Sequence, residues 1–275
     1  MPPDSRHLIE IDGLWAGYRP KTRRGWRNKQ VRWALRDISL AVESGEMVGV
    51  IGANASGKST LLQSIAGVVR PSRGSLTTRG PVASLVDLSA GFHRELTGKE
   101  NTLIVGVMSG LSRAEVRKKY ETILEFSGLD DEVMDAPLFT YSMGMWLRLG
   151  FSLLIHGDPR IILVDEVLAV GDEAFQRKCL QKIREMVQSG CCVVLVSHDL
   201  SLIQAECERV ALLEEGSLHF LGPSGEAVEK YLIMSGGQAD RQDLSHSAMF
   251  SSARRRRKWS PHSAAEDKKN DDGLV

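Results

Sequence analysis

The sequence predicts an α/β fold, because short apolar strand patterns alternate with helical patterns along most of the chain. Strand patterns occur at residues 7–14, 31–42 and 47–51, and a helical pattern follows at 58–66. A long helical stretch at about 96–156 separates this first part from a second series of strands and helices. We therefore expect an α/β core with an inserted helical subdomain.

The remaining elements follow from the same periodicities. Residues 74–86 have the character of further strands. Within the helical stretch, Ser112 and Glu115 form a capping box at the start of one helix, and Gly128 ends that helix. In the second series we expect strands at 161–164, 191–196, 210–213 and 218–221, and helices at 172–188, from 201 and at 225–234.

Composition bounds the domain organisation. The chain has 275 residues, of which 42% are hydrophobic and 25% charged, enough for one core and a small subdomain. We expect residues 1–235 to form the folded domain and residues 236–275 to form a disordered polar and basic tail. No apolar run approaches the roughly 18 to 20 residues of a membrane-spanning helix. Any work at a membrane would therefore be that of a peripheral subunit.

Charge and cysteine usage exclude some classes of protein. Lys plus Arg and Asp plus Glu each number 35, so no overall field indicates a nucleic-acid binder. Locally, residues 13–36 hold eight basic residues and no acid, and a second basic run covers 254–258. For the second run we favour a disordered arm over a membrane or nucleic-acid contact. The four cysteines lack metal-ligand spacing and no signal peptide precedes them, which favours a reducing cytoplasm.

A phosphate-binding loop is predicted between the strand at 47–51 and the helix after it. Residues 52–60 match G-x-x-x-x-G-K-[ST] in the context that this motif requires. Backbone N–H groups of such a loop and the helix N-terminus bind phosphates, while Lys58 neutralises charge and Ser59 offers a hydroxyl to Mg²⁺. The predicted nucleotide-binding residues are Gly52, Asn54, Ala55, Ser56, Gly57, Lys58, Ser59 and Thr60.

Two further strand ends carry groups that suit the same site. Asp165 and Glu166 follow four apolar residues; Asp165 would hold Mg²⁺ through water, and Glu166 would act as a general base. Two solvated acids at a strand end are the alternative. His198 follows the strand at 191–196, and parallel strands end at one rim of the sheet, so His198 would contact the γ-phosphate. Taken alone, His198 would more readily be a structural histidine.

With these motifs in this order, the chain resembles the ATP-binding subunit of an ABC transporter. Residues 141–145 (Tyr-Ser-Met-Gly-Met) look like the ABC signature loop, with Ser142 and Gly144 at the matching positions. A hydroxyl and a backbone N–H at a helix N-terminus can bind a γ-phosphate. The resemblance implies a P-loop NTPase core with an antiparallel β subdomain and an inserted α-helical subdomain.

Longer motifs narrow the resemblance. Residues 91–101, 141–145 and 164–175 look like those of ATPases of bacterial polysaccharide exporters, which move O-antigen, capsule, teichoic acid or related cell-wall glycans. By this resemblance Tyr18 stacks on adenine, with Trp33 as the substitute. Asp172 stands where the D-loop aspartate lies and would contact the partner subunit.

Three departures from the family pattern limit this comparison. Ala55 stands where the family usually has Gly, so fewer backbone conformations are open to the loop at this position. The Q-loop glutamine, a Mg²⁺ contact, is missing near residues 84–89, and Asp87 is the nearest polar replacement. Some O-antigen exporters carry a C-terminal β-sandwich that binds the glycan, and we expect no room for one after Ser235.

The resemblance also implies an assembly. One copy of each motif predicts a head-to-tail homodimer that sandwiches two ATP with Mg²⁺, where Ser142 and Gly144 act in trans. A separate dimeric membrane permease would carry a lipid-linked glycan, and the ATPase would lie peripherally at the cytoplasmic face of the inner membrane. The basic loop 19–36 either approaches anionic headgroups or a pyrophosphate lipid, or is merely solvated.

Two rival functions are weighed against glycan export. The first is an exporter subunit for another cargo, which only the resemblance to polysaccharide exporters distinguishes from glycan export. A soluble ABC ATPase acting on nucleic acid or ribosomes usually has two ATPase modules or a long inserted coiled coil. Only 142 − 58 = 84 positions separate Lys58 from Ser142, so neither is present and no nucleic-acid partner is expected.

Overall fold

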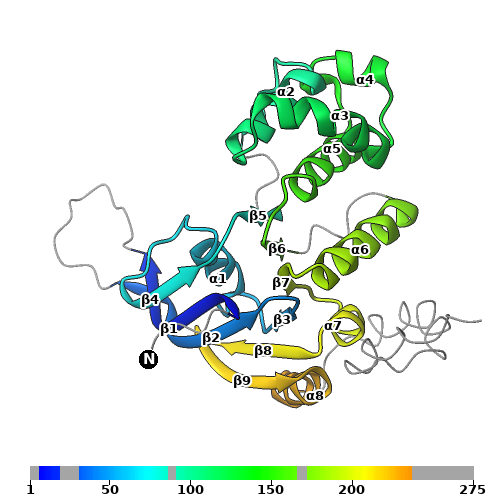
Figure 1. Cartoon of the computed structure of the whole chain (residues 1–275). Helices are drawn as coiled ribbons and strands as arrows, with labels where there is room; N and C mark the ends of the chain where they lie inside the picture. The colour runs from blue at the N-terminus through cyan, green and yellow to red at the C-terminus, as the bar shows by residue number, and fades with distance from the viewer. Residues whose placement is uncertain (1–5, 19–30, 86–90, 166–171, 237–275) are drawn as a thin grey trace, which may run out of the picture. The chain divides into compact units, whose positions relative to one another are not determined.

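The computed structural model describes residues 6–18, 31–85, 91–165 and 172–236 (Figure 1). Asp87, Glu166, most of the basic loop 19–36 and the basic run at 254–258 lie outside these ranges. The predicted boundary at residue 235 stays a prediction. Within the described ranges, no helix combines the length and the apolar character that crossing a membrane requires.

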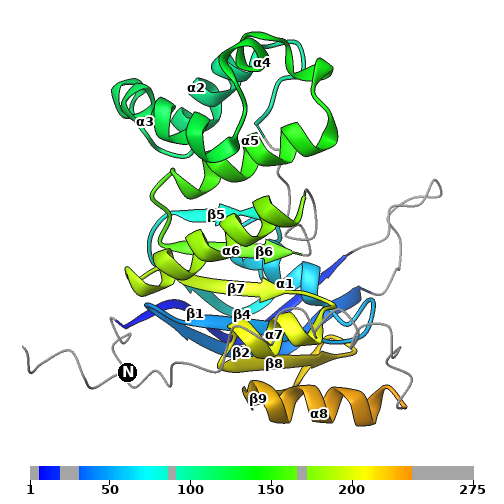
Figure 2. The same cartoon turned by 90° about the vertical axis from the view of Figure 1, so that its right-hand side faces the viewer.

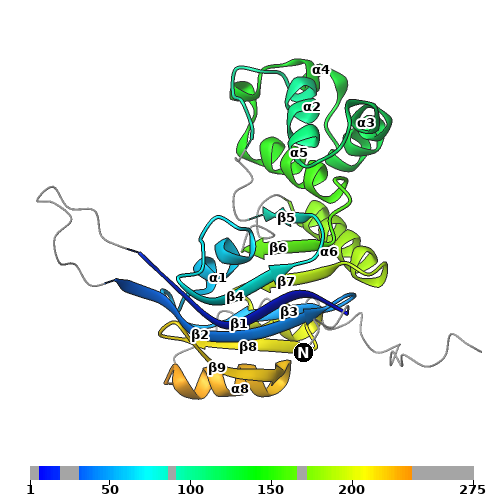
Figure 3. The same cartoon turned by 60° about the vertical axis from the view of Figure 1, so that its left-hand side comes forward.

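A three-stranded antiparallel sheet opens the chain, in the order β2-β1-β4 (Figure 3). Its strands are β1 (His7–Tyr18), β2 (Arg32–Glu43) and β4 (Arg73–Thr78). Buried and exposed positions mix along β1 and β2, as expected for strands with one face against a core. The first strand therefore continues four residues beyond the predicted end at residue 14, through its pairing with β2 up to Tyr18.

The second sheet has six strands in the order β5-β6-β7-β3-β8-β9. Its strands are β3 (Met47–Ile51), β5 (Val82–Ser84), β6 (Ile161–Asp165), β7 (Cys192–Val196), β8 (Arg209–Glu214) and β9 (Ser217–Pro223). The pairs from β5 to β8 are parallel, and β9 turns back against β8. Every residue of β3 and β7 is buried, because both faces of a central parallel strand are covered.

Two hydrophobic clusters cover the two faces of this parallel sheet. One contains the antiparallel sheet and α1 (Lys58–Ile65), packed on alternate residues of the central strands. The other contains α6 (Glu173–Gln188), α7 (Leu200–Glu206), α8 (Ser224–Met234) and the end of α5 (Met143–Ile155). Figure 2 shows α6 lying over β6 and β7. This layering confirms the predicted α/β core.

The helical subdomain has its own small core. Its elements are α2 (Gly98–Met108), α3 (Arg113–Ser127), α4 (Asp131–Asp135), a 3₁₀ turn (Leu138–Thr140) and α5. Ser112 and Glu115 form the predicted capping box, and Gly128 adopts a left-handed conformation at the end of α3. The rings of Phe126, Phe151 and Phe175 lie about 6 Å apart and join α3 and α5 to α6.

The four cysteines are buried and none forms a disulfide. Burial raises the pKa of Cys179, Cys192 and Cys207 to about 12, so these thiols keep their protons. Cys191 and Cys192 therefore act as small buried hydrophobic side chains at the start of β7.

Candidate functional site

Strand register brings three of the predicted motifs to one edge of the parallel sheet. Val196 of β7 pairs on one side with Val50 of β3 and on the other with Asp165 at the end of β6. Gly52 directly follows β3 and His198 follows β7 by two residues, so they lie at the same edge as Asp165. Because β3 and β6 are two strands apart, about 10 Å separates their ends. One bound nucleotide can span this distance.

The loop after β3 approaches its neighbours so closely that two positions require glycine. A Cβ atom at Gly52 would lie 2.2 Å from the Leu213 carbonyl oxygen, and φ at Gly52 is 150°. At Gly57, with φ of 110°, a Cβ atom would lie 2.7 Å from the Ala34 carbonyl oxygen. The loop is therefore wedged between β8 and β2.

The turn between β8 and β9 braces the same loop. The Gly216 N–H donates to the Ser56 carbonyl at 3.0 Å, and the Gly216 carbonyl accepts from the Arg36 N–H at 2.7 Å. The Ser56 side chain is buried, and its hydroxyl has no hydrogen-bond partner among the described residues. The loop's shape is thus fixed by backbone contacts with two different sheets.

The N-terminus of α1 differs from those of most other helices. No side chain caps α1, whereas α2 to α7 each begin after a residue whose side chain accepts from a first-turn N–H, namely Thr97, Ser112, Asp130, Ser142, Asp172 and Asp199. The first-turn N–H groups of Lys58, Ser59 and Thr60 have no intrahelical acceptor.

Lys58 adds a cation to this helix end. It is 7% exposed, and its ammonium donates to the carbonyls of Gly52 at 2.6 Å and Ala53 at 3.0 Å. A buried ammonium beside uncapped N–H groups fits a phosphate, and the hydroxyl of Ser59 and the carboxylate of Asp165 fit Mg²⁺. Asn54 and Ala55 are exposed on the outer side of the loop.

Two aromatic residues were predicted as alternatives for stacking on adenine. Tyr18 is 47% exposed, and its hydroxyl lies 3.3 Å from Gln63 Oε1 and 3.5 Å from Thr60 Oγ1, beside α1. The Trp33 ring packs edge-on against Trp15 at 5.3 Å, and Arg73 lies over both rings. Tyr18 therefore lies beside the loop with a free face, and Trp33 is occupied by its neighbours.

A second group of predicted residues surrounds a pocket of about 540 Å³ between α5, α6 and the α3–α4 connection. Ser142, Gly144 and Asp172, three residues predicted to face a partner subunit, all line it. The other lining residues are Gly128, Leu129, Asp130, Val133, Met145 and Arg148. No residue of the phosphate loop lines this pocket. One chain therefore presents its phosphate loop and this pocket as separate surfaces.

Ser142 is the N-cap of α5, and its hydroxyl accepts from the Met145 N–H at 3.2 Å. Because α5 begins at Met143, Gly144 belongs to the first helical turn rather than to the preceding loop. The apolar run after the signature predicts a buried helix over residues 146–154, but its first residues are only partly buried, and full burial begins at Leu149.

Comparison with known proteins identifies the family of this chain. A family model described as ABC transporter matches residues 35–169. The O-antigen export system ATP-binding protein RfbB of Klebsiella pneumoniae is 46% identical over 198 residues, which cover 72% of this chain and 80% of that protein. The chain belongs to the ABC transporter family. It is an ATP-binding, ATP-hydrolysing subunit.

Two further relatives carry export names. RfbB of Myxococcus xanthus is 38% identical and covers 83% of this chain, which spans 56% of that longer protein. The teichoic acids export ATP-binding protein TagH of Listeria innocua is 36% identical, with 81% of this chain and 64% of that protein covered.

Solved structures confirm the fold class. A dimeric ATP-binding cassette, MJ0796, bound to ADP and Pi, superposes with a TM-score of 0.67 at 20% identity, covering 79% of this chain and 99% of the other. An ATP-binding subunit of an ABC transporter gives a TM-score of 0.68 at 23% identity, covering 88% and 99%. The P-loop NTPase core with antiparallel and helical subdomains is therefore the fold of this chain.

The ABC family stretch at residues 91–101 has a structural explanation. Asn101 is fully buried, and its amide receives the His93 N–H at 2.7 Å and donates to carbonyls of His93, Leu96 and Thr97. Thr97 and Glu100 form a second capping box at the start of α2. We did not predict this box, although its T-x-x-E spacing is visible in the sequence.

Arg148 is a site residue that sequence reasoning missed. Its guanidinium pairs with Asp172 and lies 5.1 Å from the centre of the Phe175 ring. Hydrogen bonds from the Phe175 N–H and from Arg148 hold the pKa of Asp172 below its usual range. Arg148 and Asp172 are 24 positions apart, so no local sequence pattern predicts that they pair.

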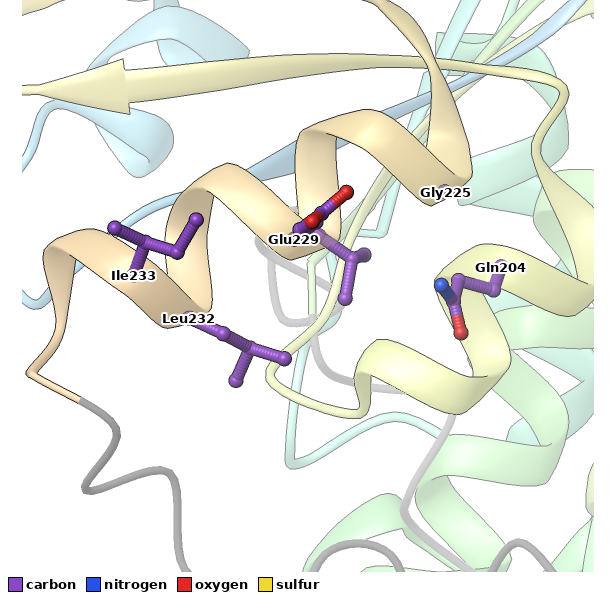
Figure 4. A pocket seen from close by; sticks show the side chains of 6 residues that line it. Gln204, Gly225, Glu229, Leu232 and Ile233 are labelled. Carbon is purple, nitrogen blue, oxygen red and sulfur yellow. The ribbon is translucent and has the colours of Figure 1, made fainter.

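A separate pocket of about 430 Å³ lies between α7 and α8 (Figure 4). Gln204 faces it from α7, and Glu229, Leu232 and Ile233 line it from α8. None of the predicted nucleotide or dimer residues lines it. It therefore plays no part in the ATPase site.

Proposed function

We propose that this chain is the ATPase subunit of an exporter that drives a lipid-linked polysaccharide across the cytoplasmic membrane. The observation that carries the proposal is the similarity to three proteins named for O-antigen or teichoic acids export, at 36 to 46% identity. The motifs at residues 91–101 and 164–175 resemble the same group. An ABC exporter of another cargo is the nearest alternative.

Each residue of the phosphate site has a role in this proposal. The first-turn N–H groups of α1 and the Lys58 ammonium bind the β and γ phosphates of ATP, and Tyr18 stacks on adenine. Ser59 and Asp165, with Asp87 as a further contact, would hold Mg²⁺, which would neutralise phosphate charge. Glu166 accepts a proton from the attacking water, and His198 contacts the γ-phosphate.

The second surface completes the site in a head-to-tail dimer. Ser142 and Gly144 of one chain bind the γ-phosphate of ATP held by the other chain, and Asp172 contacts that chain. The pocket lined by Ser142, Gly144 and Asp172, which we call the signature pocket, contains no residue of the phosphate loop, and this separation supports the arrangement. ATP then favours the closed dimer, and loss of the γ-phosphate releases it.

The dimer acts from the cytoplasmic face of the inner membrane. A dimeric permease, a separate protein that carries the lipid-linked glycan, receives the closing motion through the helical subdomain and residues 84–101. The basic segment 19–36, whose residues from Arg32 onward belong to β2, would bind anionic headgroups or the pyrophosphate of the lipid, where each Lys or Arg contributes roughly 1 kcal/mol, unless it is merely solvated.

Complementation tests the cargo. Deleting the gene in the source cell should abolish surface polysaccharide, and the wild-type chain should restore it while Glu166→Gln should not. Glu173→Gln, an exposed acid at the start of α6, is the matched control and should restore it fully. Normal polysaccharide in the deletion strain, with another compound retained inside, would establish a different cargo.

Gel filtration tests the dimer. Glu166→Gln should bind ATP without hydrolysing it and elute as a dimer only when ATP is present. The wild-type chain with ADP should elute as a monomer. An ATP-loaded Glu166→Gln chain that stays monomeric at every protein concentration would contradict the sandwich arrangement.

A further inference from the structure

Tyr141, immediately before the signature serine, is anchored inside the helical subdomain. Its hydroxyl donates to the Val133 carbonyl at 2.7 Å and lies 3.8 Å from the sulfur of Met134. Its ring packs against the core formed by α2, α3, α4 and α5.

The acceptor of this hydrogen bond belongs to the signature pocket. Val133 of α4 lines the pocket together with Ser142 and Gly144 at the start of α5. Its N–H donates to the Asp130 carboxylate at 2.8 Å, so the α4 wall is itself held by a cap. The Tyr141 phenol therefore ties the first residue of the signature loop to the α4 wall of the pocket.

Gly98 provides the space for this phenol. A Cβ atom at Gly98 would lie 2.2 Å from the Tyr141 hydroxyl oxygen and 3.0 Å from the Met134 sulfur. Gly98 is buried in the first turn of α2 and has no left-handed backbone that would require glycine. A Cβ atom would also lie 3.2 Å from the backbone Cα of Met134, so the Tyr141 hydroxyl makes the closest of three contacts that disfavour a side chain at Gly98.

We propose that Tyr141 is a positioning residue that sets the distance between the signature loop and the α4 wall, with Gly98 as the residue that admits it. The inference rests on the proposed function, in which Ser142 and Gly144 bind ATP of the second subunit. Holding the loop before the partner arrives lowers the ordering cost of closure. Tyr141 itself touches no substrate.

The phenol remains a donor under all physiological conditions. Burial raises the pKa of Tyr141 to about 12, so its proton is retained throughout the working range. Loss of the tie therefore requires a change of residue, and a mutation is the appropriate test.

Tyr141→Phe removes the hydroxyl and keeps the ring. Tyr120→Phe is the matched control, because the Tyr120 hydroxyl belongs to the same core and has no hydrogen-bond partner among the described residues. In the Glu166→Gln background, Tyr141→Phe should weaken ATP-dependent dimerisation about fivefold, the size expected for one lost hydrogen bond. ATP binding to the monomer should be unchanged, and Tyr120→Phe should match its parent in both measurements.

Gly98→Ala tests the second half of the proposal. Its methyl group should displace the phenol and weaken the dimer at least as much as Tyr141→Phe. In the double variant Gly98→Ala/Tyr141→Phe the clashing oxygen is gone, so dimerisation should recover to near the level of Tyr141→Phe alone. Such rescue is not expected if Gly98→Ala merely destabilises α2.

The outcomes separate this inference from the proposed function. If the Glu166→Gln parent forms no ATP-dependent dimer, the proposed function is wrong. If the parent dimerises and Tyr141→Phe dimerises equally well, Tyr141 has no positioning role. Equal weakening by Tyr120→Phe, or additive effects in the double variant, would likewise overturn the inference. Thermal unfolding of each variant confirms that the folded chain is being compared.

Discussion

Arg148, in the second turn of α5, forms an ion pair with Asp172, which caps α6. The Asp172 carboxylate also accepts the Phe175 N–H at 2.9 Å, and the guanidinium lies over the ring of the same Phe175. The helix that begins with the signature serine is thus linked to the residue proposed to contact the partner subunit. We therefore expect this pair to couple the two regions when the proposed dimer closes.

A double-mutant cycle measures this link. Arg148→Ala, Asp172→Asn and their combination should show small but non-additive effects in urea unfolding, because both side chains are partly exposed. ATP hydrolysis should fall in each single variant while ATP binding is kept. Arg177→Ala, which removes the exposed pair with Glu173 on the same helix, is the control and should leave hydrolysis unchanged. Strictly additive effects would exclude the coupling.

Ala55→Gly should stabilise the phosphate loop. Ala55 has φ of 64°, a left-handed conformation that costs about 1 to 2 kcal/mol for a residue with a side chain. Glycine removes this strain but loses about 0.5 to 1 kcal/mol of entropy, so a net gain of about 0.5 kcal/mol is expected. Ala53→Gly, at a neighbour without positive φ, should instead destabilise. Urea unfolding of both variants measures these changes. Loss of stability in Ala55→Gly would show that Ala55 is not strained.

Ser142→Arg should abolish ATP hydrolysis while leaving ATP binding to the phosphate loop largely intact, because the long cation would block the signature pocket. It also removes a helix cap, which costs about 1 kcal/mol. Ser112→Arg removes the comparable cap of α3 and does not line the pocket, so it should lose similar stability and keep its hydrolysis. Steady-state phosphate release and nucleotide titration give the two measurements. Hydrolysis at the wild-type rate in Ser142→Arg would count against a role in trans.

His156 should make folding stability depend on pH. Burial lowers the pKa of His156 from its ordinary value of 6.5, although the hydrogen bond with the Ser152 carbonyl opposes this shift. The surrounding charges are Lys119, Lys182 and Asp158. Because the unfolded chain then binds a proton at a higher pH than the folded one, stability should fall as pH drops below about 6.5.

Replacing His156 isolates this effect. His156→Phe keeps a ring against Phe126, which lies 5.6 Å away, and removes the titrating group. The decrease in Tm between pH 7 and 5 should be smaller in this variant than in the wild type. His219→Phe, at an exposed position, is the control and should keep the wild-type decrease. An unchanged pH dependence in His156→Phe would show that other groups cause it.

Local signals explain which elements could be predicted. The apolar run of β3, the G-x-x-x-x-G-K-[ST] loop and the capping box at Ser112 each lie within a few neighbouring residues, and the structure has all of them. The end of β1 was wrong by four residues, because pairing with β2 rather than local periodicity carries the strand to Tyr18. Gly144 was expected in a loop and lies in a helix, because the Ser142 cap starts α5 one residue later.

Contacts between distant residues could not be predicted in this way. The pair Arg148 and Asp172, the tie from Tyr141 to Val133 and the space at Gly98 depend on how helices pack. The packing of Trp33 against Trp15 and Arg73 was likewise not visible in the sequence, and the stacking of Tyr18 on adenine stays a prediction. The roles proposed for Glu166 and Asp87 still rest on sequence alone.

The sequence by itself determined the kinds of element and the phosphate loop, because hydrogen bonding and side-chain periodicity along a strand or helix are local properties. It indicated the family through the resemblance of its motifs. Only the tertiary structure decided that β3 lies between β7 and β8, and that the signature loop, the α4 wall and Asp172 enclose one pocket. The physical reason is that packing selects among many arrangements of the same elements. A pocket built from residues 128 to 172 exists only once that selection has been made.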